Sequence, residues 1–195
     1  VLVQRGDNGS MGDLACIAYE DLIYYQSFDR AWLHEVLTSQ PLSQVLDLDW
    51  NYQIRVIQPA VSYDFLVGWT KEPAISSDLI RQVKGAINEV FLKESQSAVK
   101  ILEKGLREGN KKEIETSIKR ADKNLKSLNP LIYTPALKEL QEATEGLSVC
   151  AKSSGAGGGD CGIALIFDPV ETQTLIERWK EKNIEVIYQE RMGDS

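Results

Sequence analysis

The hydrophobic positions in the last two thirds of the chain alternate between the period of strands and the period of helices. Alternating or continuous apolar runs of strand length predict four strands, and stripes with a 3.6-residue period predict the helices between them. The predicted strands are 63–70, 147–151, 161–167 and 184–189. The predicted helices are 79–92, 97–107, 111–128, 135–147 and one that begins after Phe167. This order is that of a split βαβ unit with additional helices after its first strand. We therefore predict an α+β fold whose C-terminal domain, residues 61–195, is ferredoxin-like.

Two of these helices have clear start signals. Thr134 followed by Pro135 is typical of an N-cap and first-turn proline. Asp168 and Glu171 have the spacing of a capping box, in which each side chain accepts a backbone hydrogen bond. The apolar face of the second helix is predicted to consist of Val170, Leu175, Ile176 and Trp179.

Residues 1–60 do not fit this plan. Their pattern predicts helices at 13–19 and 29–37, the second capped by Asp29, and strands at 22–28 and 51–58. We interpret them as the trailing part of another domain whose remaining strands lie upstream. The start at Val1 without a methionine agrees with a chain that is a fragment.

Composition narrows the class of protein. The 195 residues are 43% hydrophobic and 26% charged, which is ordinary for a globular protein. The apolar runs, such as Ile163 to Phe167, are far shorter than the roughly 20 residues of a membrane-spanning helix. With 29 acidic and 22 basic residues, a net charge of −7 argues against nucleic-acid binding. Three cysteines without a CxxC pair and a single histidine argue against zinc and favour a cytoplasmic protein.

A glycine-rich loop between two predicted strands is the strongest chemical feature. Successive glycines let backbone N–H groups converge on an anion, and serine hydroxyls add donors. The alternative is a flexible linker, although this loop is short and joins strands that should pair. The predicted phosphate loop is Gly155, Ala156, Gly157, Gly158 and Gly159, with Ser153 and Ser154 as hydroxyl donors.

Neither common nucleotide motif explains this loop. The Walker A pattern is absent, whereas Gly157, Gly159 and Gly162 formally match GxGxxG. In a dinucleotide-binding fold, that fingerprint opens a helix. Here a predicted strand follows, so the match is misleading.

Two charged residues are candidates for a role in catalysis or binding. Asp13 follows the small-residue run 5–12 and stands at the start of a predicted helix, where the helix field stabilises an anion. Such a carboxylate is able to orient a nucleophile or accept its proton, but a simple helix cap remains an equal alternative. Lys71 follows a predicted strand and could face a polyphosphate, although a solvated turn lysine is more common.

Three segments together resemble the GHMP kinase superfamily, and within it the members that phosphorylate 5-phosphomevalonate. They are RGDNGSMGDLA (5–15), FLVGWTKEPA (65–74) and AKSSGAGGGDCGIAL (151–165). The segments YQSFDR (25–30) and YQER (188–191) extend the resemblance over essentially the whole chain.

The resemblance implies a reaction and its cofactors. An enzyme of this kind transfers the γ-phosphoryl group of ATP, with Mg²⁺, to 5-phosphomevalonate and forms 5-diphosphomevalonate in the mevalonate route to isoprenoids. Asp13 takes the place of the catalytic aspartate, and the glycine loop that of the third conserved motif. Ser10 and Ser27 are implied substrate contacts. Local cations such as Lys71, Lys152 and Arg191 are hypothetical neutralising groups for the phosphates.

One difference from the family is that the first two motifs, which include a second ATP-binding loop, would lie upstream of residue 1. We therefore expect the missing N-terminal segment to be a necessary partner, and we assign no metal ligand to this chain. A homodimer remains open. Alternatives are another GHMP kinase, such as one that phosphorylates mevalonate, or a non-catalytic ferredoxin-like module that binds a phosphate ligand.

Overall fold

The computed structural model describes residues 11–72, 83, 86–155 and 157–193. The chain divides into two compact units, Val1–Gln58 and Pro59–Ser195. Each unit has its own sheet, with two strands in the first and four in the second.

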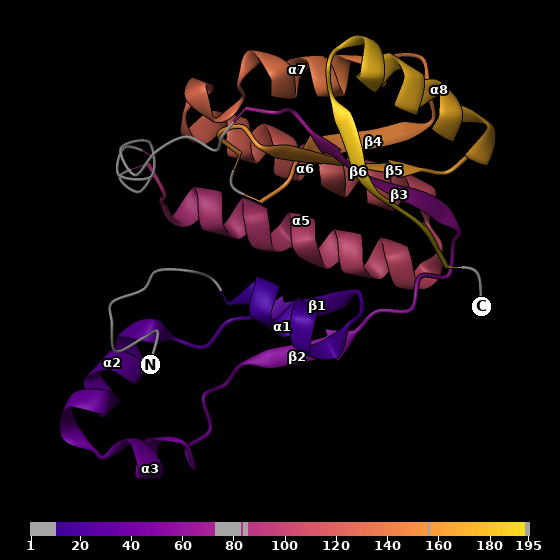
Figure 1. Ribbon diagram of the computed structural model, residues 1–195. Coiled ribbons are helices and arrows are strands. Elements are labelled where there is room, and N and C mark those ends of the chain that lie inside the picture. The colour runs from indigo at the N-terminus through magenta and orange to yellow at the C-terminus, as the bar shows by residue number, and fades with distance from the viewer. Residues whose placement is uncertain (1–10, 73–82, 84–85, 156, 194–195) are drawn as a thin grey trace. The chain divides into compact units, whose positions relative to one another are not determined.

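The second unit is built on an antiparallel sheet with the strand order β4-β5-β3-β6 (Figure 1). Its strands are β3 (Tyr63–Trp69), β4 (Val149–Ser153), β5 (Cys161–Ile166) and β6 (Glu185–Met192). β5 pairs with both β3 and β4, so these two strands run parallel on either side of it. This is the split βαβ arrangement, and the predicted ferredoxin-like topology is confirmed.

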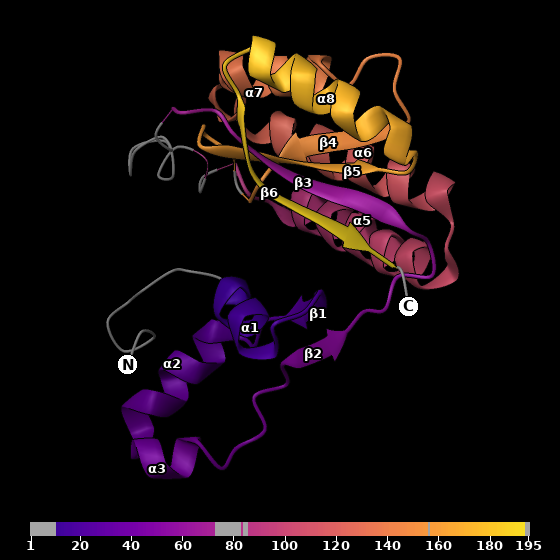
Figure 2. The ribbon, with the colours of Figure 1, turned by 45° about the vertical axis from the view of Figure 1, so that its right-hand side comes forward.

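Helices cover both faces of this sheet. Figures 1 and 2 show α7 and α8 on one face and α5 on the other, and α6 contacts β4. The helical elements are α5 (Glu89–Glu108), α6 (Lys111–Leu128), the short 3₁₀ helix η2 (Pro130–Ile132), α7 (Pro135–Glu142) and α8 (Pro169–Glu181).

The core of the second unit lies between the sheet, α7 and α8. Its centre is Trp179, which is fully buried and whose indole N–H donates to the carbonyl oxygen of Leu140 at 2.9 Å. Gly68 of β3 makes room for the indole, because a Cβ there would lie 2.8 Å from a ring carbon of Trp179. Other fully buried members are Leu66, Leu140, Ala164, Ile166 and Leu175.

Two predicted helices, 79–92 and 97–107, are wrong in their boundaries. α5 is one continuous helix, and Ala86–Asn88 just before it are not helical. Asn88 is its N-cap, because the side-chain oxygen accepts a hydrogen bond from the backbone N–H of Phe91 at 3.0 Å. The apolar period continues through this break, so periodicity alone did not locate it. Residues 79–82 and 84–85 lie outside the described residues.

Replacing Asn88 by alanine should lower the free energy of unfolding by about 1 kcal/mol, because the first turn of α5 loses its side-chain acceptor. Urea denaturation followed by tryptophan fluorescence would measure this change. Asn88→Ser is the matched control, since serine also caps helices. A loss of equal size in both variants would contradict the capping role.

The start of α8 confirms half of the predicted capping box. The Asp168 carboxylate accepts from the backbone N–H of Val170 at 3.0 Å, as expected. Glu171 instead accepts from the backbone N–H of Ser148 at 2.6 Å, so the reciprocal bond was predicted wrongly. Val170 was also wrongly placed on the apolar face, since it is 80% exposed. At about 100° per residue, it points roughly 140° away from the buried Leu175.

The first unit contains the two helices and two strands expected for residues 13–58, and also a short helix, α3 (Leu42–Val45), which was not predicted. The expected elements are α1 (Gly12–Tyr19), β1 (Ile23–Gln26), α2 (Arg30–Ser39) and β2 (Gln53–Val56). β1 and β2 pair antiparallel, and Asp29 caps α2 by accepting from the backbone N–H groups of Ala31 and Trp32. Within the described ranges, no helix of either unit combines the length and apolarity needed to cross a membrane.

Candidate active site

The glycine loop connects β4 to the antiparallel β5. Every one of its described residues from 155 to 160 has a left-handed backbone: Gly155 at φ 59°, Gly157 at 78°, Gly158 at 92°, Gly159 at 114° and Asp160 at 63°. Glycine adopts such angles without the steric penalty of a Cβ. The path of the chain therefore favours a run of glycines here. Ala156 lies outside the described residues.

Alternate amides of this loop are used to hold it in place. Ser154 donates to the carbonyl of Cys161 at 2.8 Å, Gly158 to that of Ile132 at 2.7 Å, and Asp160 to that of Glu72 at 2.9 Å. The intervening amides of Gly155, Gly157 and Gly159 have no acceptor within the described part of the chain. Three unengaged N–H groups in a short glycine loop are suited to an anionic ligand.

The middle of the loop is seated on η2. A Cβ on Gly157 would lie 2.3 Å from the Cγ2 atom and 2.9 Å from the carbonyl oxygen of Ile132. At Gly155, by contrast, a Cβ would meet nothing within 4 Å. The loop is thus packed on one side and open on the other, which favours a binding loop over a flexible linker.

The loop exit is tied to the end of β3. The backbone N–H and the hydroxyl of Thr70 both donate to the carbonyl oxygen of Asp160, at 2.7 and 2.8 Å. Thr70 is only 5% exposed. Sequence reasoning missed this residue, because the local pattern marked it only as the end of a strand.

The loop entrance is held by a buried tyrosine. The backbone N–H of Ser153 donates to the hydroxyl oxygen of Tyr133 at 3.2 Å, and that hydroxyl donates to the Asp122 carboxylate. Burial and this hydrogen bond to Asp122 raise the pKa of Tyr133 to about 12, so the hydroxyl keeps its proton at neutral pH. No local signal in the sequence pointed to either residue.

The two predicted serine donors differ in position. Ser153 is fully buried, whereas Ser154 is exposed on the loop. Only Ser154 therefore presents its hydroxyl at the surface.

The three candidate cations lie in different places. The Lys152 ammonium donates to the carbonyl of Ser153 at the loop entrance, and burial lowers its pKa while Asp122 acts in the opposite direction. The Lys71 ammonium is 3.3 Å from the amide oxygen of Asn183 and 3.4 Å from a carboxylate oxygen of Glu185, near the turn after α8.

Arg191 lies away from the glycine loop. It pairs with Asp64 at 3.0 Å, and the other carboxylate oxygen of Asp64 accepts from the hydroxyl of Thr172. Asp64 is six residues before Thr70 along the β3 direction, which corresponds to roughly 20 Å of extended chain. Arg191 therefore joins β6 to the end of β3 remote from the loop.

Asp13 lies in the first unit as the second residue of α1. The N-cap is Met11, which has a left-handed backbone at φ 65° and no side-chain capping bond. The Asp13 carboxylate is exposed and has no hydrogen-bond or ion-pair partner among the residues that the structure describes. It is thus not a cap.

The two other predicted substrate contacts are also in the first unit. Ser27 is exposed, and its hydroxyl donates to the carbonyl of Phe28 at 3.3 Å. Ser10 lies outside the described residues.

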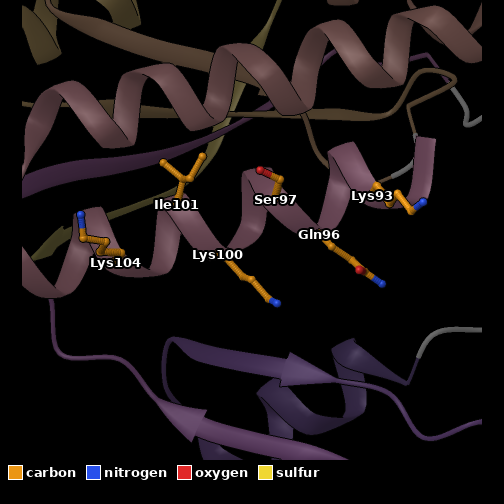
Figure 3. A pocket seen from close by; sticks show the side chains of 6 residues that line it. All are labelled: Lys93, Gln96, Ser97, Lys100, Ile101 and Lys104. Carbon is orange, nitrogen blue, oxygen red and sulfur yellow. The ribbon is translucent and has the colours of Figure 1, made fainter. Parts of the chain in front are cut away.

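A groove of about 400 Å³ runs along α5. Figure 3 shows Gln96 and Lys100 extending from the same side of this helix. Lys93 pairs with Glu89, and Lys104 pairs with Glu108 and Glu113. Its lining is completed by Ser97 and Ile101. Most of the positive charge of this groove is thus neutralised by carboxylates of α5 and α6.

Comparison with known proteins defines the class first. Residues 97–185 match the family model described as GHMP kinases C terminal. Together with the split βαβ topology, this match means that the chain contains a GHMP kinase C-terminal domain.

The most informative relatives are phosphomevalonate kinases. The chain is 32% identical over 169 residues to the phosphomevalonate kinase of Streptomyces sp. (strain CL190), an alignment that covers 81% of this chain and 45% of that protein. It is 51% identical, with a TM-score of 0.93, to crystal structures of Streptococcus pneumoniae phosphomevalonate kinase, one of them in complex with phosphomevalonate and AMPPNP. These matches cover 98% of this chain and 59% or 58% of those chains. The chain therefore spans about half the length of these relatives.

Proposed function

We propose that the protein containing this chain transfers the γ-phosphoryl group of ATP to the phosphate of 5-phosphomevalonate, giving ADP and 5-diphosphomevalonate. The observation that carries this proposal is the 51% identity and 0.93 TM-score to a phosphomevalonate kinase that binds phosphomevalonate and AMPPNP. The glycine loop supports it, because three of its amides have no acceptor among the described residues and are suited to phosphate oxygens.

The first unit is proposed to be the C-terminal part of the kinase N-terminal domain. A two-stranded sheet is marginally stable by itself, and this unit leaves large apolar side chains exposed, among them Ile17 at 71%, Leu46 at 62% and Tyr52 at 57%. The remainder of a larger domain would cover such surface. The greater length of the relatives agrees with this interpretation.

In the proposed mechanism, this chain mainly binds and orients phosphate groups. Phosphoryl transfer depends on alignment and on stabilisation of charge by fixed donors. The free amides of Gly155, Gly157 and Gly159 would supply such donors, and Lys152 would add positive charge at the loop entrance.

Asp13 is proposed to orient the acceptor. A phosphate monoester has a second pKa of about 6, so it is largely deprotonated at neutral pH and needs little help from a base. An exposed carboxylate at a helix N-terminus is well placed to hold the position of such a group through a bridging water.

ATP would arrive as its Mg²⁺ complex, in which the metal spreads the charge of the β- and γ-phosphates. The described residues contain no group of three or more His, Cys, Asp or Glu side chains that could hold a metal ion. They therefore do not form a dedicated metal cage, and no step is assigned to a metal ligand of this chain. The cytoplasm is the proposed compartment, since ATP is available there and all three cysteines are free thiols.

³¹P NMR would test the proposed function. The chain would be joined to the N-terminal region of its relatives and incubated with ATP and Mg²⁺ plus either 5-phosphomevalonate or mevalonate. New diphosphate resonances with 5-phosphomevalonate alone would support the proposal. A phosphomonoester formed from mevalonate would indicate a mevalonate kinase instead, and no transfer to either acceptor would favour a binding module. The isolated chain is the control, for which no transfer is expected.

A further inference from the structure

The strand that leads into the glycine loop lies at an edge of the sheet. Within the part of the chain that the structure describes, β4 pairs with β5 alone, so its outward-facing N–H and C=O groups have no strand partner there. At the end of β4 next to the loop, two side chains form the hydrogen bonds that a neighbouring strand would otherwise make. Tyr133 accepts from the backbone N–H of Ser153 at 3.2 Å, and the side-chain amide of Gln141 donates to the carbonyl of Ala151 at 3.0 Å.

Both of these side chains are held by one carboxylate, that of Asp122 on α6. Its Oδ1 atom accepts from the Tyr133 hydroxyl and from the Gln141 amide, the latter at 2.8 Å, and its Oδ2 atom accepts from the Lys126 ammonium at 2.7 Å. The Asp122 side chain is only 14% exposed. A carboxylate is an acceptor at both oxygens, so it satisfies three donors at once.

The residue before Tyr133 also contacts the glycine loop, at a second point. Ile132, next to Tyr133, accepts from the backbone N–H of Gly158 at 2.7 Å and packs against Gly157. Ile132 is 1% exposed and Tyr133 is 3% exposed. A displacement of Tyr133 would therefore disturb the loop both at its entrance and at its middle.

We propose that Asp122 is a positioning residue for the phosphate loop. By holding Tyr133 and Gln141, it fixes the end of β4 and the Ile132 carbonyl, and so keeps the free amides of Gly155, Gly157 and Gly159 in a preorganised arrangement. Donors that are already in place need no reorganisation when charge develops on a phosphate. The catalytic consequence rests on the proposed kinase function, whereas the effect on the loop does not.

Amide hydrogen exchange of the chain, read by mass spectrometry, tests the effect on the loop. Asp122→Asn puts an NH₂ group among three donors, and Tyr133→Phe removes the hydroxyl that links Asp122 to Ser153. Both variants should speed exchange of peptides covering 153–160 by about tenfold, with exchange in α5 unchanged. The double variant should exchange no faster than the more affected single variant, because both changes break one link.

Glu115→Gln is the matched control, because Glu115 is a half-exposed carboxylate on the same helix that pairs with Lys119 at 4.0 Å and forms no hydrogen bond with Tyr133 or Gln141 in the described part of the chain. Its loop exchange should equal that of the parent. Loop exchange in Asp122→Asn and Tyr133→Phe that equals this control would overturn the proposal. Faster exchange throughout the second unit, α5 included, would overturn it as well, because it would indicate a general structural role. If Asp122→Asn does not fold, the loop exchange of Tyr133→Phe alone tests the proposal.

A kinetic readout completes the test in the protein that includes the N-terminal region. Both variants should lower kcat/KM for ATP by about tenfold and leave KM for 5-phosphomevalonate unchanged. Faster loop exchange with unchanged ATP kinetics would contradict a positioning role. Absence of transfer in the parent protein would instead overturn the proposed function, and the exchange results would still decide whether Asp122 orders the loop.

Discussion

Replacing Asp13 by asparagine should lower kcat by at least about a hundredfold in the protein that includes the N-terminal region, with KM for 5-phosphomevalonate changed by less than about threefold. The fall in kcat is expected because the asparagine no longer orients the acceptor phosphate for transfer. The exposed carboxylate has no structural partner among the described residues, so its loss should leave α1 intact. Steady-state assays of ADP release at varied 5-phosphomevalonate would give both constants.

Glu35→Gln provides the control for this experiment. Glu35 is an exposed carboxylate in α2 of the same unit, and the structure gives its side chain no ion pair among the described residues. Its kinetics should match those of the parent. If Asp13→Asn retains the parental kcat, the catalytic assignment of Asp13 is wrong, and the resemblance then identifies the family without identifying this residue's role.

Replacing Gly157 by alanine should displace the glycine loop and lower kcat/KM for ATP by at least about a hundredfold. The left-handed angle of 78° costs a non-glycine residue about 1–3 kcal/mol. The added Cβ would also lie 2.3 Å from a methyl carbon of Ile132, and overpacking of this kind costs typically about 1–3 kcal/mol. Because Ile132 is fully buried, the loop should move rather than its support.

Two further alanine variants separate these contributions. Gly155→Ala has a similar angle of 59° but meets nothing within 4 Å, so it should suffer only the backbone strain. Gly146→Ala, at 76° in the turn after α7, should reduce stability without affecting transfer, since it lies outside the loop. Titration of ATP followed by tryptophan fluorescence, together with thermal unfolding, would compare all three. Equal effects of Gly157→Ala and Gly155→Ala would contradict the importance of the contact with Ile132.

Much of the second unit could be predicted because its information is local. The four strands and the helices α6 and α8 follow from apolar periods of 2 and 3.6, and the caps Asp168 and Thr134 bond to backbone N–H groups only two or three residues away. The predictions failed where two local signals conflicted, or where a side chain bonds to a residue far away in the sequence. Asn88 caps the start of α5, although the apolar period runs through this position without a break. Glu171 accepts a hydrogen bond from the backbone N–H of Ser148, which is 23 residues away in the sequence.

The sequence by itself determined the chemical character of the candidate site. Glycine adopts the left-handed backbone at 155 and 157–159 without a steric penalty, and the composition of the loop therefore already indicated its shape and its capacity for anions. The small-residue approach to Asp13 likewise indicated a helix start with an acidic first turn, and α1 begins there.

Only the tertiary structure decided how the loop is held and which of the candidate cations lies next to it. Thr70 meets Asp160 across 90 residues, Tyr133 meets Ser153 across 20, and Arg191 is held by Asp64 across 127. Backbone preferences act over a few neighbouring residues, so they can be inferred from a short stretch of sequence. Hydrogen bonds between distant side chains depend on which strands and helices pack together, and that packing exists only once the sheet has formed.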